Sequence, residues 1–531
     1  MQKRSKLKVL TSAERSRSQR QFVAPNPGDL IVMLVFGWAM FCFFLVTVGE
    51  RLLRNVARLA TDESVRKALL EGDQALGGVM VGGSLALGVT VVLVYKFPRL
   101  FLPFMVFALA FASASWKPIH DVAWLIKYLG VVFLGAYAAQ SAYKNFWRFV
   151  AVPFVRLIIA YLAWVAVICV FVGGRNDDFW YLGTEVAFLL GFAVVWVYEF
   201  NNKYGLEDFN RMLSWAAVAI VAAHVMSPFV VDTFIHNGRF QSYFNRATGF
   251  GVAMAPVSVV LFWRAMSETN PQKAGFFSVM ALLSFGLILW SGSRSPTAAT
   301  IMAVALLWWL FRSRLLVVML ILAVLGAAVQ LVLSVGSTGD VGALAERMQT
   351  TETGRTLIWA RYIKVAIESP IYGYSPSGMK FAIVGGGLAD YLASQGAQFN
   401  VLGVHNAYLG IALRLGLVGL ALFMAMLVSA VGRAKRVLSS KLIPEAEKRN
   451  YILPVALILV FCFVCMFEDK VPGQGKGTLE GFLLYASIFI CQVYGSRLIN
   501  IYERSGGKLK PINTVDGMKI MTEPPVPAAS N

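Results

Sequence analysis

One histidine has the sequence surroundings of a general base. His405 opens the sequence HNAYL (405–409), which leads directly into a long apolar run. An imidazole changes its protonation state near neutral pH, so it can take a proton from a hydroxyl group during a transfer reaction. Asn406 and Tyr408 are near enough along the chain to orient this imidazole or a bound substrate. The alternative is that His405 and Asn406 only cap the helix that follows.

Three arginines form a second candidate group. Arg294 lies in SGSRS, Arg355 in TGRTLIW and Arg239 in HNGRFQSYFN. A guanidinium group binds phosphate oxygens through two parallel hydrogen bonds and keeps its charge at any working pH. With Ser293, Arg294 forms a polar step before an apolar run, and a helix that starts there points its N-terminal amides at anions. The alternatives are that these side chains only reach for lipid headgroups, and that Arg246 replaces Arg239.

The acidic residues do not form a metal-binding pattern. The chain has no Asp-x-Asp sequence, and its two acidic pairs, Asp177–Asp178 and Glu468–Asp469, are adjacent residues. Adjacent side chains of an extended loop point apart, so such a pair is a poor ligand set for one cation. We interpret these acids as solvated groups that balance nearby cations. The sequence therefore predicts a reaction without a bound metal or any other cofactor.

The composition excludes a soluble enzyme and an ordinary nucleic-acid-binding module. Of 531 residues, 57% are hydrophobic and 15% are charged, whereas soluble domains have roughly 45–50% and about 25%. The mean hydropathy is +0.64. The net charge of +19 fits a membrane protein, because cytoplasmic loops collect Lys and Arg.

The apolar runs predict an all-α integral membrane protein. A helix needs about 20 apolar residues to cross the hydrocarbon core. About fourteen runs qualify, near 29–49, 76–95, 100–116, 121–141, 149–172, 184–200, 212–230, 249–265, 274–290, 296–311, 315–336, 407–431, 451–467 and 478–497.

The positions of the basic residues orient these spans. Residues 1–28 form a basic tail, which we expect in the cytoplasm. Spans 1–11 lie within 29–336, a long periplasmic loop occupies 337–406, and spans 12–14 lie within 407–497. Fourteen crossings return the tail at 498–531 to the cytoplasm.

Several charged features do not follow this simple pattern. The basic segment 50–75 falls on the predicted outer side, as a surface-lying amphipathic helix or because a span is miscounted. Lys127, Glu185 and Arg414 lie within or at the ends of spans, where charge is unfavourable. They are either functional or paired inside the bundle.

The long loop is the most informative segment. It is far longer than a usual connection of about 4–6 residues, and such loops are usually functional or disordered. Apolar residues recur at helical spacing over 353–370, and turns are indicated at 372–378 and 385–387. We expect a half-ordered domain that caps the membrane.

Taken together, these motifs resemble the O-antigen ligase and polymerase superfamily. The resemblance rests on the SRS step, the loop pattern GR…W…GYxxxG and HNxYL, and it covers roughly 235–430. It implies a multispan transferase whose donor is a glycan carried on undecaprenyl pyrophosphate and whose acceptor is a glycan or a lipid core. It also implies an active site between the long loop and the bundle, in contact with membrane lipid, with no nucleic acid and with other polysaccharide-export proteins as candidate partners.

The sequence thus predicts an inverting, metal-independent glycosyltransferase of the bacterial inner membrane. Arg294 and Arg355, with Arg239 in support, would hold the pyrophosphate, and His405 would deprotonate the acceptor hydroxyl. Ser293, Asn406 and Tyr408 would assist them. A polymerase of exopolysaccharide or O-antigen repeats is slightly favoured over a ligase.

Two other functions stay open at this point. A transporter or flippase predicts internal repeats and broken helices with polar groups near the middle of the membrane. A non-catalytic scaffold of an export complex predicts that Arg294, Arg355 and His405 tolerate single substitution.

Overall fold

The computed structural model of the chain describes thirteen stretches of residues: 98–112, 114–115, 120, 123–124, 126–134, 153–197, 205–229, 234–236, 239–244, 246–311, 355–379, 404–468 and 478–504. Several sequence-based predictions lie outside these residues, namely the tail 1–28, the spans near 29–49, 76–95 and 315–336, the segment 50–75, the turn 385–387, Asp469, and the tail beyond 504.

The described secondary structure is helical except for one short hairpin. Its elements are α5 (Pro98–Phe111), α7 (Pro153–Val167) with the π-helix η1 (Ile168–Gly173), α8 (Asn176–Val186) with the π-helix η2 (Ala187–Trp196), α10 (Leu206–Met226) with η3 (Ser227–Phe229), β1 (Ile235–His236), β2 (Arg239–Phe240), α11 (Ala247–Ser267), α12 (Pro271–Trp290), α13 (Arg294–Phe311), α16 (Arg355–Glu368), α19 (Ala407–Ser439), α20 (Glu445–Cys465) and α21 (Leu479–Ile499) with η4 (Asn500–Arg504).

The described part of the chain is an all-α integral membrane bundle, as predicted. Eight of its helical segments are long and apolar enough to cross a membrane: Phe154–Gly173, Leu206–Phe229, Ala247–Ser267, Pro271–Trp290, Arg294–Phe311, Ala407–Ser439, Glu445–Cys465 and Leu479–Glu503. Each coincides with a predicted span. The total of fourteen stays a prediction.

Several element boundaries differ from the sequence-based ones, among them the start of α8 and the end of the helical structure after α21. The predicted span near 184–200 follows a loop, but α8 already begins at Asn176, because the acids at its start satisfy a helix N-terminus. At the other end of the chain, helical structure continues through η4 to Arg504, past residue 498, where we expected the tail to begin.

Hydrogen bonds between loops define one end of the bundle. Ser115 Oγ donates to the carbonyl of Tyr243 at 2.7 Å, which joins the end of α5 to the segment after β2. Asn406 Nδ2 donates to the carbonyl of Met466 at 3.2 Å, which joins the start of α19 to the end of α20. We call this end the loop face, and it comprises 114–115, 173–178, 227–229, 234–236, 239–244, 291–294, 370–379, 404–406 and 466–468.

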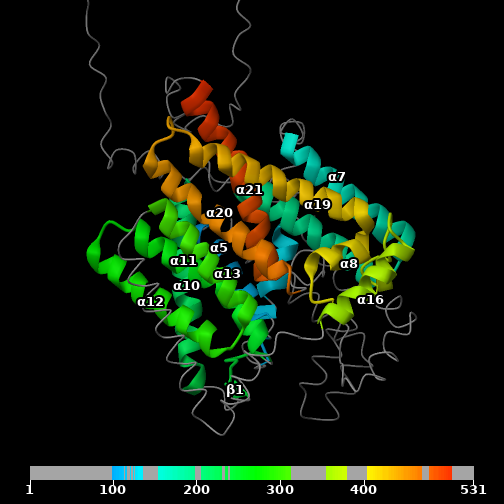
Figure 1. Cartoon of the computed structure of the whole chain (residues 1–531), viewed down its shortest axis with the longest axis horizontal. Coiled ribbons are helices and arrows are strands. Elements are labelled where there is room, and N and C mark those ends of the chain that lie inside the picture. The colour runs from blue at the N-terminus through cyan, green and yellow to red at the C-terminus, as the bar shows by residue number, and fades with distance from the viewer. Residues whose placement is uncertain are drawn as a thin grey trace, which may run out of the picture.

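The opposite end is defined in the same way. Trp263 Nε1 donates to the carbonyl of Arg449 at 2.8 Å, so the end of α11 meets the start of α20. Asn210 Nδ2 donates to the carbonyl of Asn450 at 2.9 Å, which brings the start of α10 to the same place. In Figure 1 the hairpin that contains β1 lies at the lower end of the bundle, and the C-terminal end of α21, coloured red, lies at the upper end.

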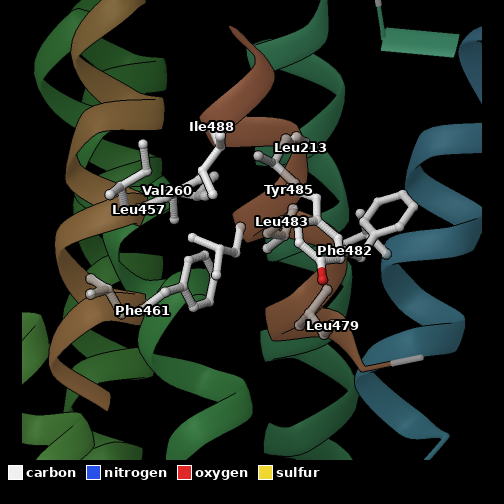
Figure 2. Close-up of a cluster of buried hydrophobic side chains, with 14 of the residues drawn as sticks. Leu213, Val260, Leu457, Phe461, Leu479, Phe482, Leu483, Tyr485 and Ile488 are labelled. Atoms are coloured by element: carbon white, nitrogen blue, oxygen red, sulfur yellow. The ribbon is translucent and has the colours of Figure 1, made fainter. Parts of the chain in front are cut away.

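The core forms around α11 and α21. Helix α11 is buried on nearly all sides by α10, α12, α13 and α20. Figure 2 shows Leu213 of α10, Val260 of α11 and Leu457 of α20 among the apolar side chains beside Leu483 and Ile488 of α21. Since lipid tails are as apolar as these side chains, close packing and buried hydrogen bonds hold such helices together. One such bond joins the hydroxyl groups of Ser284 and Ser258 at 3.0 Å.

Helix α19 is interrupted at Gly416. This residue has φ 68° and ψ −176° inside a run of helical residues, a conformation that is essentially restricted to glycine. An interruption of this kind frees carbonyl and amide groups that a helix normally pairs internally. In the membrane these groups must find other partners, because there is no water to accept or donate hydrogen bonds.

The turn after α16 supplies those partners. Tyr374 N donates to the carbonyl of Leu413 at 2.8 Å, and Ser375 N donates to the carbonyl of Arg414 at 3.0 Å. Leu417 N donates to the carbonyl of Pro370 at 2.7 Å. The turn at 370–375 is therefore inserted into the broken helix, whereas we had expected the loop to cap the membrane from outside.

A tryptophan from α7 pairs with a further carbonyl group of the interrupted segment of α19. Trp164 Nε1 donates to the carbonyl of Leu415 at 2.8 Å, and its ring stacks on Tyr372 at a centroid distance of 6.0 Å. The broken segment of α19 thus contacts both a membrane-spanning helix and the turn. These contacts fix the start of α19, where His405 lies, relative to α16.

Candidate active site on the loop face

His405 lies beside a buried acid. Its Nδ1 atom is 3.8 Å from Oε2 of Glu468, which is within ion-pair distance but longer than a hydrogen bond. The His405 side chain is 31% exposed and that of Glu468 is 8% exposed. The backbone of His405 has φ 49°, in the left-handed region that residues other than glycine seldom adopt. Residues held in such conformations cluster at functional sites.

The residues on both sides of His405 are anchored. Asn406 caps α19 by accepting a hydrogen bond from Leu409 N at 3.0 Å, and its Nδ2 atom donates to Met466 O. Trp359 Nε1, from α16, donates to the carbonyl of Val404 at 3.1 Å. The HNAYL sequence is therefore held between α16 and the end of α20. The hydroxyl of Tyr408 donates to the carbonyl of Cys462 at 3.0 Å and so also ties α19 to α20.

The start of α16 lies close to this sequence. Arg355 is the first residue of α16, one turn before Trp359, and one turn is about 5.4 Å of helix. A small apolar cluster of Tyr362, Val365, Met379, Val404 and Leu413 packs α16 against the start of α19. The backbone of Arg355 therefore lies one helical turn from Trp359, the residue that holds Val404 beside the predicted general base.

Tyr374 packs against this apolar cluster. The hydroxyl of Tyr374 donates to the carbonyl of Val365 at 3.0 Å and is 3.3 Å from the carboxylate of Glu368. Burial and the neighbouring Glu368 charge raise the pKa of Tyr374 above its ordinary value, so the phenol stays protonated and keeps donating.

The other two predicted arginines meet at one turn. Arg239, in β2, donates from Nε to the carbonyl of Ser291 at 2.7 Å. Arg294, three residues later, is exposed and begins α13. Ser293 is buried, and its hydroxyl donates to the carbonyl of Ala247 at 2.9 Å, which fixes this turn against α11. The exposed Arg246 precedes α11.

The bundle brings both groups to the loop face. Helices α13 and α20 pack side by side. They run in opposite directions, because Ser293 joins the start of α13 to the start of α11, whereas Trp263 joins the end of α11 to the start of α20. The start of α13 and the end of α20 are therefore at one end of the bundle. Arg294 begins α13, and Glu468 follows α20.

The interpretation of Asp178 as a solvated acid was wrong. Asp178 is fully buried in α8. Its Oδ1 accepts from Ser377 N at 2.8 Å, and its Oδ2 accepts from Ser377 Oγ at 2.5 Å and from Arg175 N at 3.2 Å. The available signal was the acidic pair directly before an apolar run, which is typical of a helix N-terminus. The partner in the long loop had no signal in the sequence.

The same interpretation of Glu468 was also wrong, because this side chain is buried beside His405. An acid that follows an apolar span is usually exposed, so the sequence alone favoured the solvated alternative. Hydrogen bonds from Asn406 to Met466 and from Tyr408 to Cys462, which the sequence does not reveal, bring the two segments together.

The charged residues inside spans are buried within the bundle. Glu185 accepts a hydrogen bond from the hydroxyl of Tyr485 at 2.6 Å. Arg414 is 3% exposed. Lys127 is also buried, with its ammonium group 5.1 Å from the centre of the Tyr128 ring.

One region of the chain matches a known protein family. Residues 279–424 match the family model described as O-Antigen ligase. The matched region contains Arg294, Arg355 and His405, whereas Arg239, Asp178 and Glu468 lie outside it. No curated protein matches the chain. The match confirms the resemblance predicted from the sequence motifs: residues 279–424 are similar to the O-antigen ligase family, within a chain whose described helices make it a multi-pass membrane protein.

Proposed function

We propose that this protein transfers or polymerises undecaprenyl-pyrophosphate-linked glycan at the periplasmic face of the bacterial inner membrane, with both chain termini in the cytoplasm. The observation that carries the proposal is the position of the four predicted residues. Arg239, Arg294 and His405 belong to the loop face, and Trp359 joins α16, which begins with Arg355, to the residue before His405.

The reaction we propose is a direct displacement at the anomeric carbon. An acceptor hydroxyl oxygen attacks this carbon as the bond to the pyrophosphate oxygen breaks, so the configuration inverts. His405 takes the proton of the attacking hydroxyl. The pyrophosphate leaves with its charge balanced by arginines, which makes a bound metal ion unnecessary.

The arginines have different surroundings, which supports different roles. Arg294 is exposed at the N-terminus of α13, where backbone amides add to the attraction for an anion. Arg239 is partly buried, and its Nε atom is engaged by Ser291. We assign Arg294 and Arg355 to direct pyrophosphate binding. Arg239 supports them from the adjacent hairpin.

The test of the proposed function uses cells whose only copy of the gene encodes His405→Ala. We expect undecaprenyl pyrophosphate to accumulate unused glycan. Single repeat units would identify a polymerase, which we favour, and long chains would identify a ligase. The matched control is His236→Ala, a histidine on β1 of the same face. A wild-type glycan profile with the His405→Ala protein present in the membrane would refute the proposal.

The arginines are tested with purified protein. Arg294→Ala and Arg355→Ala should each lower the rate by roughly 10²–10³-fold, as does loss of one oxyanion-binding donor elsewhere. Arg449→Ala, an exposed arginine at the opposite end of the bundle, is the control. A chelator should leave the wild-type rate unchanged, and loss of activity with chelator would contradict metal independence.

A further inference from the structure

We infer that Glu468 is a positioning residue for His405, an inference that rests on the proposed function. Its carboxylate faces the Nδ1 side of the imidazole across 3.8 Å. A neutral imidazole carries a proton on only one nitrogen, and the partner of that nitrogen selects the tautomer. A carboxylate on the Nδ1 side favours the Nδ1–H form. The lone pair of Nε2 is then available to the acceptor hydroxyl.

The burial of Glu468 makes this effect strong. Its side chain is 8% exposed, so little water screens its charge, whereas the 31% exposed imidazole is open to a substrate. When His405 takes the proton it becomes an imidazolium ion directly beside this carboxylate. The pair therefore stabilises the charge that forms as the acceptor attacks, as an acid does in base–acid pairs of other transferases and hydrolases.

Hydrogen bonds and ring contacts hold the backbone around His405 and Glu468 in place. His405 keeps an unfavourable φ of 49° because the residues on either side of it are fixed. Val404 is held by Trp359, and Asn406 is held by Met466. The ring of Trp359 also contacts the ring of Phe467, the residue before Glu468, at a centroid distance of 6.4 Å. One side chain of α16 thus contacts the neighbours of both members of the pair.

At 3.8 Å, the Nδ1 atom of His405 and Oε2 of Glu468 are within ion-pair distance and beyond hydrogen-bond distance. Only the side-chain torsions of His405 and Glu468 must change to bring Nδ1 and Oε2 into hydrogen-bond distance, because the backbone on both sides is already anchored.

The test compares purified wild-type protein with Glu468→Gln, Glu468→Asp and Glu468→Ala. We expect Glu468→Gln to lower kcat by about 10²-fold or more, with the KM for the lipid-linked donor changed by less than about threefold. Glu468→Asp keeps the charge and should recover part of the rate. Glu480→Gln is the matched control. Like Glu468, Glu480 is a buried glutamate near the loop face, and it lies in the first turn of α21.

The decisive measurement is a double-mutant cycle with His405→Ala. If Glu468 acts through His405, then Glu468→Gln has no further effect on the residual rate of His405→Ala. Equal fold-losses in both backgrounds would overturn the inference. So would a Glu468→Gln enzyme with wild-type kcat while His405→Ala is inactive. A fully active His405→Ala enzyme would instead refute the proposed function itself, so the two failures are distinct.

Discussion

The carboxylate of Asp178 accepts two hydrogen bonds from Ser377, one from its backbone N–H at 2.8 Å and one from its hydroxyl at 2.5 Å. The two residues are 199 positions apart in the chain. Asp178 lies in the first turn of α8, and Ser377 follows the turn at 370–375 that is inserted into the broken helix α19. This contact therefore fixes the long loop to the bundle.

Removing the Asp178 carboxylate should release the turn. Asp178→Ala leaves two buried donors of Ser377 and the backbone N–H of Arg175 without their acceptor, which we expect to cost about 3 kcal/mol of stability. Thermal unfolding in detergent measures the loss, and limited proteolysis within 370–379 should become faster. Asp177→Ala, the less buried neighbour, is the control. Equal melting temperatures for both variants would contradict the role of Asp178.

The interruption of α19 should depend on glycine at position 416. In Gly416→Ala the new Cβ would overlap the carbonyl of Ile371 and would have to adopt φ 68°. We expect a loss of about 1–3 kcal/mol from backbone strain alone, together with reduced transferase activity. Gly432→Ala, in the same helix, meets nothing within 4 Å and should be neutral or stabilising. A Gly416→Ala protein as stable and active as Gly432→Ala would show that the interruption has no importance.

Tyr485 should stabilise the bundle through Glu185. Tyr485→Phe removes the donor to a carboxylate that is 4% exposed, and we expect a loss of about 1–3 kcal/mol. Tyr494→Phe is a matched control in α21, because its hydroxyl donates at 2.7 Å to Glu447, which is only half-buried. Thermal unfolding of the two variants should show the larger decrease for Tyr485→Phe, and the reverse order would contradict the argument.

Arg239 and Arg246 are distinguished by a conservative substitution. Lysine keeps the charge but cannot reproduce the Nε bond to Ser291. We therefore expect Arg239→Lys to lower kcat/KM about tenfold, which corresponds to about 1.4 kcal/mol. Arg246→Lys should leave kcat/KM within about twofold, because Arg246 is exposed at the start of α11. If Arg246→Lys showed the larger loss, Arg246 would replace Arg239 as the supporting residue.

The sequence by itself determined the class of the protein and the residues to examine. Long apolar runs can satisfy their backbone only as helices within lipid, so hydropathy alone predicted each of the eight spans that the structure describes. Motifs such as SGSRS and HNAYL are local, and local order along the chain is enough to find Arg294 and His405. The helix at the start of the long loop was also predicted, because its apolar residues recur at helical spacing.

Only the tertiary structure decided which residues these motifs meet. Asp178 and Glu468 read as solvated acids, because the sequence around an acid does not reveal a partner brought from a distant segment. The break at Gly416 gave no signal either, since glycine also occurs at ordinary positions in membrane helices. Burial, and the hydrogen bonds that burial demands, arise only when α8, α16, α19 and α20 are packed together, and they are what places an acid behind His405 and a turn inside α19.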